Sequence, residues 1–234
     1  MDGHGRASRR EATEMSERTG MRGHDPYRGR RPTSHERRAG QPWDASYLGG
    51  AAPWDLAQPQ SAIVRLAGEG AFAGGVLDAG CGTGENALYV ASLGLRVLGV
   101  DVAETALSIA REKAAARGID ADFVVADALC LDRLGRAFET VIDCGLFHTF
   151  DTEERRDYAA SLASVTGRGA NLYVLCFSDI GPDARGPHPV SQEELRAAFG
   201  RRTGWSIASV SPDWIQTSSD TNGVPAWLAR INRT

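Results

Sequence analysis

Residues 76–92, with the sequence VLDAGCGTGENALYVAS, constrain the fold of this chain more than any other segment. A short apolar run leads into glycines at positions 80, 82 and 84, and an amphipathic run follows at once. This order predicts a strand, a tight turn and a helix. Glycine lacks a Cβ and tolerates positive φ, so such a turn lets the backbone and the first helical N–H groups approach a ligand. Nucleotide-like ligands bind at such turns, outside the first strand of an open α/β sheet.

Two classes of nucleotide cofactor use this geometry, and the spacing of the glycines discriminates between them. The dinucleotide fingerprint G-x-G-x-x-G/A fails when counted from Gly80, because its sixth residue is a glutamate, but it is met from Gly82 to Ala87. The alternative pattern, an acid followed by x-G-x-G-x-G, is complete from Asp78 to Gly84. An acid beside a pyrophosphate repels it, so the second pattern is the better match.

The complete pattern resembles the first motif of the class I S-adenosylmethionine-dependent methyltransferases. The resemblance implies S-adenosyl-L-methionine as cofactor and S-adenosyl-L-homocysteine as product, with the acid near the cationic methionine end of the cofactor. It also implies a Rossmann-like α/β fold: a seven-stranded, mostly parallel sheet with helices on both faces and a C-terminal antiparallel hairpin. The cofactor contacts implied within the motif are Asp78, Gly80, Cys81, Gly82 and Gly84.

Two further strands of buried type also end in acids. The run 96–101 ends at Asp101, and a carboxylate at the end of a second strand accepts from ribose hydroxyls in both cofactor classes. The run 121–127 ends at Asp127, which by the resemblance accepts from the adenine amino group. Because the carboxyl ends of parallel strands share one edge of the sheet, we expect these acids to lie near Asp78. The remaining expected cofactor contacts are Val102, Ala128 and Cys144.

Residues 41–59 contain two Trp-Asp pairs and a tyrosine among glycines and prolines. Aromatic side chains in so irregular a segment must pack on something, and they form either a surface strap or a lid. The pattern W-D-x-x-Y followed by P-W-D resembles the N-terminal signature of the thiopurine and thiol/halide methyltransferase-like branch, where the segment closes over cofactor and substrate. Indole faces attract a sulfonium, so Trp43 and Trp54 are predicted cofactor contacts and Tyr47 a substrate contact. Alanine and serine replace a Gly and a Pro that are usual in the branch, at positions 57 and 61.

Residues 138–150 predict a fourth strand and the loop after it, which in this class faces the transferring methyl group. His148 either accepts the nucleophile's proton, orients the acceptor or simply packs, and Asp143 is the second candidate base. Phe147 is a predicted substrate contact. Asp179 is another, because it opens a Gly/Pro-rich loop, 178–190, that is long enough to form a substrate lid.

Composition narrows the remaining possibilities. The formal net charge of the 234 residues is −4, which gives no general attraction to nucleic acid or membrane. Residues 1–40 carry ten arginines against six acids, and we expect a disordered Arg-rich tail there, dispensable up to residue 38. The methyltransferase domain is then 41–234, with a lid at 41–66.

Four cysteines lack zinc or disulfide spacing, so we expect no metal and reduced thiols in the cytoplasm. The single lysine beside 25 arginines indicates a GC-rich, bacterial coding bias.

The expected reaction is transfer of a methyl group from S-adenosylmethionine to an O, N or S nucleophile of a small aromatic or heterocyclic acceptor. Such a protein mainly holds the reacting atoms in line and excludes water. An NAD(P)-dependent oxidoreductase is the alternative from the Gly82 register, although no Tyr-x-x-x-Lys pair is present. A nucleic-acid-associated methyltransferase using the basic tail is another, although no N/D-P-P-Y/F motif follows the fourth strand. We expect no membrane or nucleic-acid partner, and the sequence leaves the oligomeric state open.

Overall fold

The computed structural model describes residues 25–180 and 188–234. The chain divides into two units, Met1–Arg31 and Pro32–Thr234. In the described part of the first unit, the carboxylate of Asp25 accepts hydrogen bonds from the N–H groups of Tyr27 (2.9 Å) and Gly29 (2.6 Å). All helices and strands considered below belong to the second unit.

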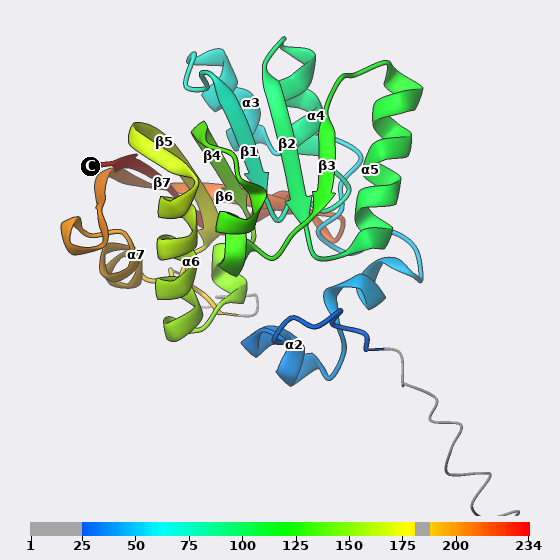
Figure 1. Ribbon diagram of the computed structural model, residues 1–234, viewed down its shortest axis with the longest axis horizontal. Helices are drawn as coiled ribbons and strands as arrows, with labels where there is room; N and C mark the ends of the chain where they lie inside the picture. The colour runs from blue at the N-terminus through cyan, green and yellow to red at the C-terminus, as the bar shows by residue number, and fades with distance from the viewer. Residues whose placement is uncertain (1–24, 181–187) are drawn as a thin grey trace, which may run out of the picture. The chain divides into compact units, whose positions relative to one another are not determined.

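Seven strands form one sheet in the order β3-β2-β1-β4-β5-β7-β6 (Figure 1). Strands β1 to β5 pair in parallel, and β7 runs antiparallel to both β5 and β6. The strand order reverses between β1 and β4, and open α/β sheets bind ligands beyond the carboxyl ends of the strands at such a point. The strands are β1 (Gly75–Ala79), β2 (Arg96–Asp101), β3 (Asp122–Val125), β4 (Phe138–Cys144), β5 (Thr166–Phe177), β6 (Trp205–Thr217) and β7 (Asp220–Arg233). This confirms the predicted sheet and its C-terminal hairpin.

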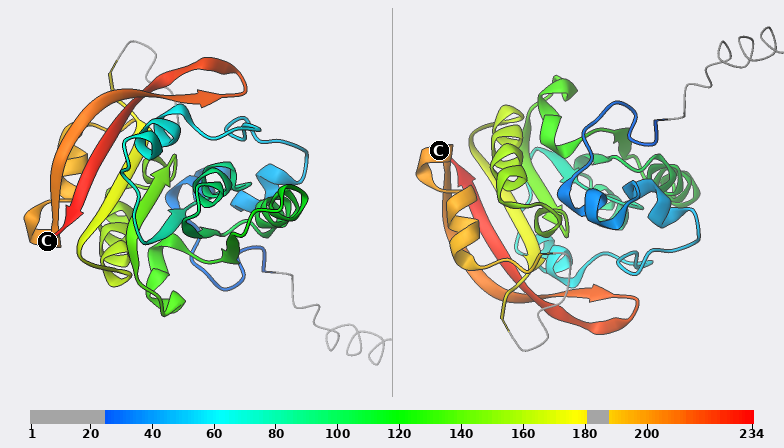
Figure 2. Two further views of the ribbon diagram at one scale, coloured as in Figure 1. Left: turned by 90° about the horizontal axis from the view of Figure 1, so that it is seen from above. Right: turned by 90° about the horizontal axis from the view of Figure 1, so that it is seen from below.

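Helices cover both faces of the sheet (Figure 2). One core contains Ile63, Leu88 and Leu107 from α3, α4 and α5, and the other contains Tyr158 and Phe199 from α6 and the end of α7. The helices are α2 (Ser34–Ala39), α3 (Ser61–Gly68), α4 (Glu85–Ser92), α5 (Glu104–Arg117), α6 (Thr152–Ser164) and α7 (Gln192–Ala198), with short 3₁₀ turns η1 (Trp43–Tyr47), η2 (Ala128–Leu134), η3 (Phe147–Thr149) and η4 (Arg201–Thr203). Among the described residues, no helix is long and apolar enough to cross a membrane.

Local sequence explains most of these elements. Asp151 and Ser191 each cap a helix in a capping box, as their spacing from a following glutamate predicts. The residue pattern predicts two final strands at 205–210 and 225–231, and the strands β6 and β7 of the C-terminal hairpin are both longer than that. Pro212 argues against a strand that continues past residue 210, because proline has no N–H to donate. However, β6 is an edge strand, where such a residue is tolerated.

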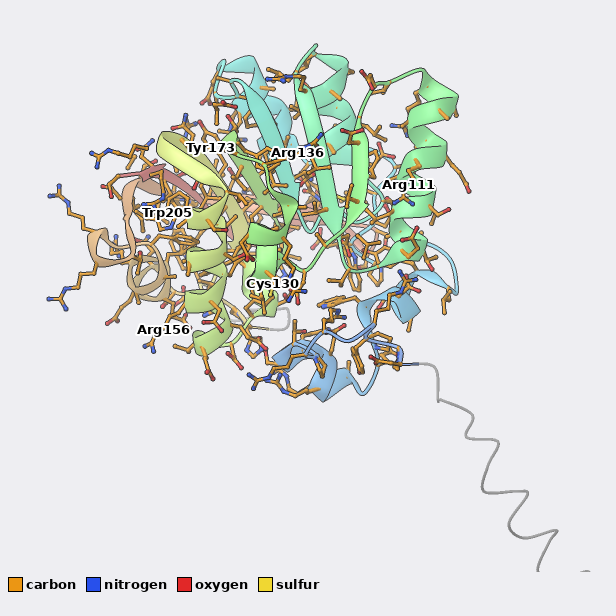
Figure 3. The ribbon with its side chains drawn as sticks, in the orientation of Figure 1. Arg111, Cys130, Arg136, Arg156, Tyr173 and Trp205 are labelled. Atoms are coloured by element: carbon orange, nitrogen blue, oxygen red, sulfur yellow. The ribbon has the colours of Figure 1, made fainter. Side chains whose placement is uncertain are left out.

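Side-chain hydrogen bonds to the backbone tie these layers together (Figure 3). The fully buried indole of Trp205 on β6 donates to the carbonyl of Ala159 on α6 at 3.0 Å. The Tyr173 hydroxyl on β5 donates to the carbonyl of Ala71 at 2.9 Å. Arg111 on α5 donates through two nitrogens to one carbonyl of β3, at 2.9 and 3.2 Å. These bonds tie α6 to β6, the segment before β1 to β5, and α5 to β3.

Residues 34–39 form helix α2, whereas the sequence predicted a disordered tail over residues 1–40. Thr33 caps it in a capping box with Glu36, whose side chain is 1% exposed. The N–H and hydroxyl of Ser34 each donate to the Glu154 carboxylate on α6 at 2.6 Å. The folded unit therefore begins at Pro32 instead of residue 41. Residues 1–24 of the predicted tail lie outside the described part of the chain.

We predict that two truncations differ sharply in stability. Removal of residues 1–31 leaves the free energy of unfolding unchanged, whereas removal of residues 1–40 lowers it by about 1.5–3 kcal/mol, the scale of lost hydrogen bonds to charged groups. Urea unfolding followed by circular dichroism measures both. Glu36→Ala in the full chain is the point control and should reproduce part of the loss. Equal stability of the two truncations would show that α2 contributes nothing to the fold.

Candidate functional site

The glycine turn lies between β1 and α4 at the carboxyl edge of the sheet. The N–H groups of Gly80 and Cys81 donate to the carbonyl of Val100 on β2, at 2.8 and 3.0 Å. Gly80 has φ +71°, and a Cβ there would stand 3.0 Å from the side chain of Leu146. Gly82 has φ +54°, and a Cβ there would stand 3.1 Å from the Tyr47 hydroxyl. Both glycines are therefore required for conformation and for space.

Asp101, at the end of β2, ties this turn to the start of α5. One carboxylate oxygen accepts from the N–H of Gly82 and the other from the N–H of Ala103, each at 2.9 Å. Asp127, just after β3, accepts from the N–H of Leu129 at 2.9 Å and so caps η2. The parallel strands thus bring the predicted acids to one edge. Val102 and Ala128 follow directly in the chain, at the same edge.

Asp78, at the end of β1, is 1% exposed, and its Oδ2 has no hydrogen-bond partner in the described structure. Burial, together with the nearby charge of Asp143, raises the pKa of Asp78 to about 7. Burial likewise raises the pKa of Asp143 to about 7. Two buried carboxyl groups on adjacent strands make this point unfavourable for anions and favourable for a cation.

The carboxyl group of Asp143 organises the loop after β4. Its Oδ1 accepts from the N–H groups of Leu146 (3.0 Å) and Phe147 (3.2 Å). Phe147 is fully buried, with its ring centroid 5.4 Å from that of Phe199. This differs from the expected acceptor contact, because the Phe147 side chain belongs to the core beneath the loop. Asp143 and Phe147 together hold the position of the residue that follows, His148.

His148 is 5% exposed, and its ring stacks on Phe177 with centroids 4.2 Å apart. Its Nδ1 accepts from the backbone N–H of Phe177 at 3.2 Å. Burial first, then the charge of Arg155, lowers the pKa of His148 to about 3. The ring is therefore neutral, and since Nδ1 accepts a hydrogen bond, the proton lies on Nε2. Of the roles predicted for His148, this arrangement favours orienting an acceptor over taking its proton.

In each of the two Trp-Asp pairs, the aspartate accepts a hydrogen bond from a threonine of the sheet's carboxyl edge. Asp44 accepts from the N–H (2.7 Å) and hydroxyl (3.0 Å) of Thr105 at the start of α5, where the chain's own N-cap, Ala103, has no capping side chain. Asp55 accepts from the Thr83 hydroxyl in the glycine turn. In each pair the aspartate anchors the segment, and the adjacent tryptophan is held over the carboxyl edge.

The aromatic side chains of the N-terminal segment contact one another. Trp43 and Trp54 meet edge to face at 5.8 Å between centroids, and the Trp54 indole N–H donates to the Tyr47 hydroxyl at 3.0 Å. Tyr47, a predicted acceptor contact, is buried beside Gly82 of the predicted cofactor turn. Trp54 is 44% exposed. Cation–π capacity is therefore available at the surface of the site.

His35 was missed by the sequence analysis. Its ring stacks on Trp43 with centroids 4.3 Å apart and 9° between the planes. Glu36 accepts from the backbone N–H of Trp43 at 3.0 Å, which connects α2 to η1. The capping-box spacing from Thr33 to Glu36 was the one available signal that a helix begins here.

The remaining predicted site residues make fewer contacts that define the site. Burial raises the pKa of the thiols of Cys81 and Cys144, so both stay protonated. Asp179 is exposed, and its N–H donates to the carbonyl of Val190 at 3.1 Å. Most of the predicted substrate lid, residues 181–187, lies outside the described residues. Within the described residues, no group of three His, Cys, Asp or Glu side chains is placed to hold a metal ion.

Comparison with known proteins places the chain among methyl-transferring enzymes. A family model for a methyltransferase domain matches residues 76–169. The 2-heptyl-1-hydroxyquinolin-4(1H)-one methyltransferase of Mycobacteroides abscessus is 39% identical over 171 residues, which cover 72% of this chain and 74% of the relative.

Two solved structures extend the comparison. A protein studied for the conversion of a disulfide bond into a thioacetal group during echinomycin biosynthesis aligns with a TM-score of 0.74 and 41% identity, over 81% of this chain and 91% of that chain. Magnesium protoporphyrin IX methyltransferase from Synechocystis PCC 6803, solved with bound S-adenosylmethionine, aligns with a TM-score of 0.57 and 28% identity, over 74% and 77% of the two chains.

We predict that Asp44→Ala lowers the free energy of unfolding by about 0.5–2 kcal/mol, because the α5 N-terminus loses its cap. Asp44→Asn keeps an accepting oxygen and should lose less. Asp120→Ala makes the same change at an exposed position and should have no effect. Urea titration of the three variants measures these differences. If Asp44→Ala and Asp120→Ala unfold at the same denaturant concentration, Asp44 is not an anchor.

Proposed function

This chain belongs to the class I S-adenosylmethionine-dependent methyltransferases, and we propose that it methylates an oxygen, nitrogen or sulfur nucleophile of a small aromatic or heterocyclic acceptor. Because the chain belongs to this family, the alternative of an NAD(P)-dependent oxidoreductase, with the dinucleotide fingerprint counted from Gly82, is excluded. The nucleic-acid alternative rested on residues 1–40, most of which lie outside the described structure, and nothing described supports it.

The site fits the cofactor. The buried Asp78 oxygen without a partner is a place for a cationic group, and this observation carries the proposal. The glycine turn provides a cradle that a Cβ at Gly80 or Gly82 would fill. We assign Asp101 to the ribose hydroxyls and Asp127 to the adenine amino group. When bound, the cofactor supplies a methyl group already activated by a sulfonium.

The protein's own contribution is then orientation and exclusion of water. The segment anchored by Asp44 and Asp55 holds two indoles over the carboxyl edge. An aromatic acceptor suits this setting, since flat rings pack well against Trp and His faces. The relative from Mycobacteroides abscessus acts on a hydroxyquinolinone, which supports a heteroaromatic acceptor here.

Calorimetric titration with S-adenosylmethionine, S-adenosylhomocysteine and NAD⁺ tests the cofactor assignment. Binding of the two adenosyl ligands without NAD⁺ is expected. Mass-spectrometric detection of methylated product from a panel of phenols, thiols and N-heterocycles then tests the acceptor class. A panel without any methylated product would refute the proposed acceptors while leaving the cofactor assignment standing.

We predict that Asp101→Ala weakens S-adenosylmethionine binding by ~1–3 kcal/mol, because the ribose loses an ionised hydrogen-bond acceptor and the turn loses its tie. Asp101→Asn keeps one accepting oxygen for the backbone and should lie between wild type and Asp101→Ala. Titration calorimetry gives all three affinities. Unchanged affinity in Asp101→Ala would remove the ribose assignment.

We predict that cofactor affinity depends on pH through Asp78. Its pKa is about 7 in the free protein, and a bound cation lowers that pKa by favouring the carboxylate. Affinity for S-adenosylmethionine therefore rises as the pH increases toward about 7 and levels off above it, with proton release on binding below that pH. Calorimetry in buffers of different protonation enthalpy measures the released protons. Asp78→Asn should abolish the dependence, and a pH-independent wild type would contradict the assignment.

A further inference from the structure

His148 offers one unused polar atom to the acceptor. Only 5% of the residue is exposed. Its Nδ1 accepts a hydrogen bond from the backbone N–H of Phe177, and one face of the imidazole ring stacks on the Phe177 ring. Nε2 makes no hydrogen bond with any described residue. Nε2 is not sealed from solvent, so an acceptor bound at this loop can reach it and accept a hydrogen bond from its N–H.

The groups that face His148 oppose its protonation. Arg155 from α6, His35 from α2 and His188 from the residues before α7 each act to lower its pKa, and Phe177 from β5 contributes only an apolar ring and an N–H donor. Positive charge on His148 would therefore lie near the Arg155 guanidinium in a dry environment. His148 cannot store a proton taken from the acceptor.

Most acidic side chains around this loop are buried or paired. Asp143 is fully buried: its Oδ1 holds the loop from beneath, and its Oδ2 has no hydrogen-bond partner in the described structure. Three other carboxylates are engaged by neighbouring side chains: Asp151 with Arg37, Glu154 with Ser34, and Glu194 with Arg155. Asp179, at the start of the 178–190 loop, is exposed, and the pH profiles described below test whether it or any other group of the protein acts as a base.

We propose that His148 holds the acceptor by donating from Nε2–H to its ionised nucleophilic group, and that the acceptor class is aromatic hydroxyl or thiol compounds acidic enough to bind as anions. This rests on the proposed function. The acceptor loses its proton to solvent before or during binding. Its lone pair then forms the bond to the methyl carbon while the carbon–sulfur bond breaks and that electron pair stays on sulfur. The protein takes up no proton. The Nε2–H donor also favours the anion of the bound acceptor.

Two kinds of measurement test this assignment. The first is the pH dependence of kcat/KM for phenols and thiophenols of graded acidity, measured in the wild-type protein with S-adenosylmethionine saturating at every pH, so that ionisation of Asp78 does not contribute. We expect the acidic limb of each profile to shift with the acidity of the compound. A limb at one fixed pH for all compounds would overturn the inference, because it would report a base on the protein.

The second measurement compares His148→Gln with His148→Ala. Glutamine carries an N–H donor but cannot act as a base, so we expect kcat/KM within about tenfold of wild type and the same pH profile. Alanine removes the donor, and a loss of about 10- to 100-fold, mostly in KM, is expected. Equal inactivity of both variants, with cofactor binding and melting temperature unchanged, would overturn the donor role.

The outcomes separate this inference from the function on which it rests. A wild-type protein that binds S-adenosylmethionine but methylates no compound of the panel contradicts both. Turnover with a fixed acidic limb contradicts the inference alone. If neither variant folds, the wild-type profiles still decide, because they require no substitution at His148.

Discussion

Backbone N–H groups at the strand-to-helix turns are the constraint on which this site depends. Each turn at the carboxyl edge exposes donors that no strand or helix satisfies. Carboxylates fill these positions: Asp101 accepts from Gly82 and Ala103, and Asp143 accepts from the loop after β4. Asp44 does so from 61 residues away in the chain, at Thr105. The acids at this edge are therefore first of all structural, and they set the shape into which a ligand must fit.

Asp78 differs from the edge acids whose oxygens are all paired. Its buried Oδ2 lacks a partner, as does Oδ2 of Asp143 on the adjacent strand, and burial together with the charge of Asp143 raises the pKa of Asp78. A carboxyl group in this state is stabilised only by a proton or by a cation. Cofactor binding and ionisation of Asp78 are consequently coupled, because the burial that makes the ionised carboxylate costly also makes a sulfonium ligand favourable.

The acceptor side has the opposite character. His148 is neutral and donates, Arg155 lies nearby, and the indoles of the anchored segment add flat apolar faces. The two ends of the site thus differ in charge. Carboxylates face the position of the cofactor's positive charge, and hydrogen-bond donors face the acceptor. Such a division fits a reaction in which the methyl group leaves a cation and joins an electron-rich atom, and in which orientation matters more than proton transfer.

Local sequence determined the elements whose signals are short-range. The glycine turn, the strand-end acids at 78, 101 and 127, and the capping boxes of α6 and α7 follow from neighbours within a few residues. Only the tertiary structure decided the rest. Helix α2 has no apolar stripe and is held by Glu154, 120 residues beyond Ser34. The protonation state of His148 depends on Phe177 and Arg155, and Phe147 is buried because Phe199 packs against it. Hydrogen bonding and burial between distant segments are properties of the fold, so residue type and spacing alone cannot supply them.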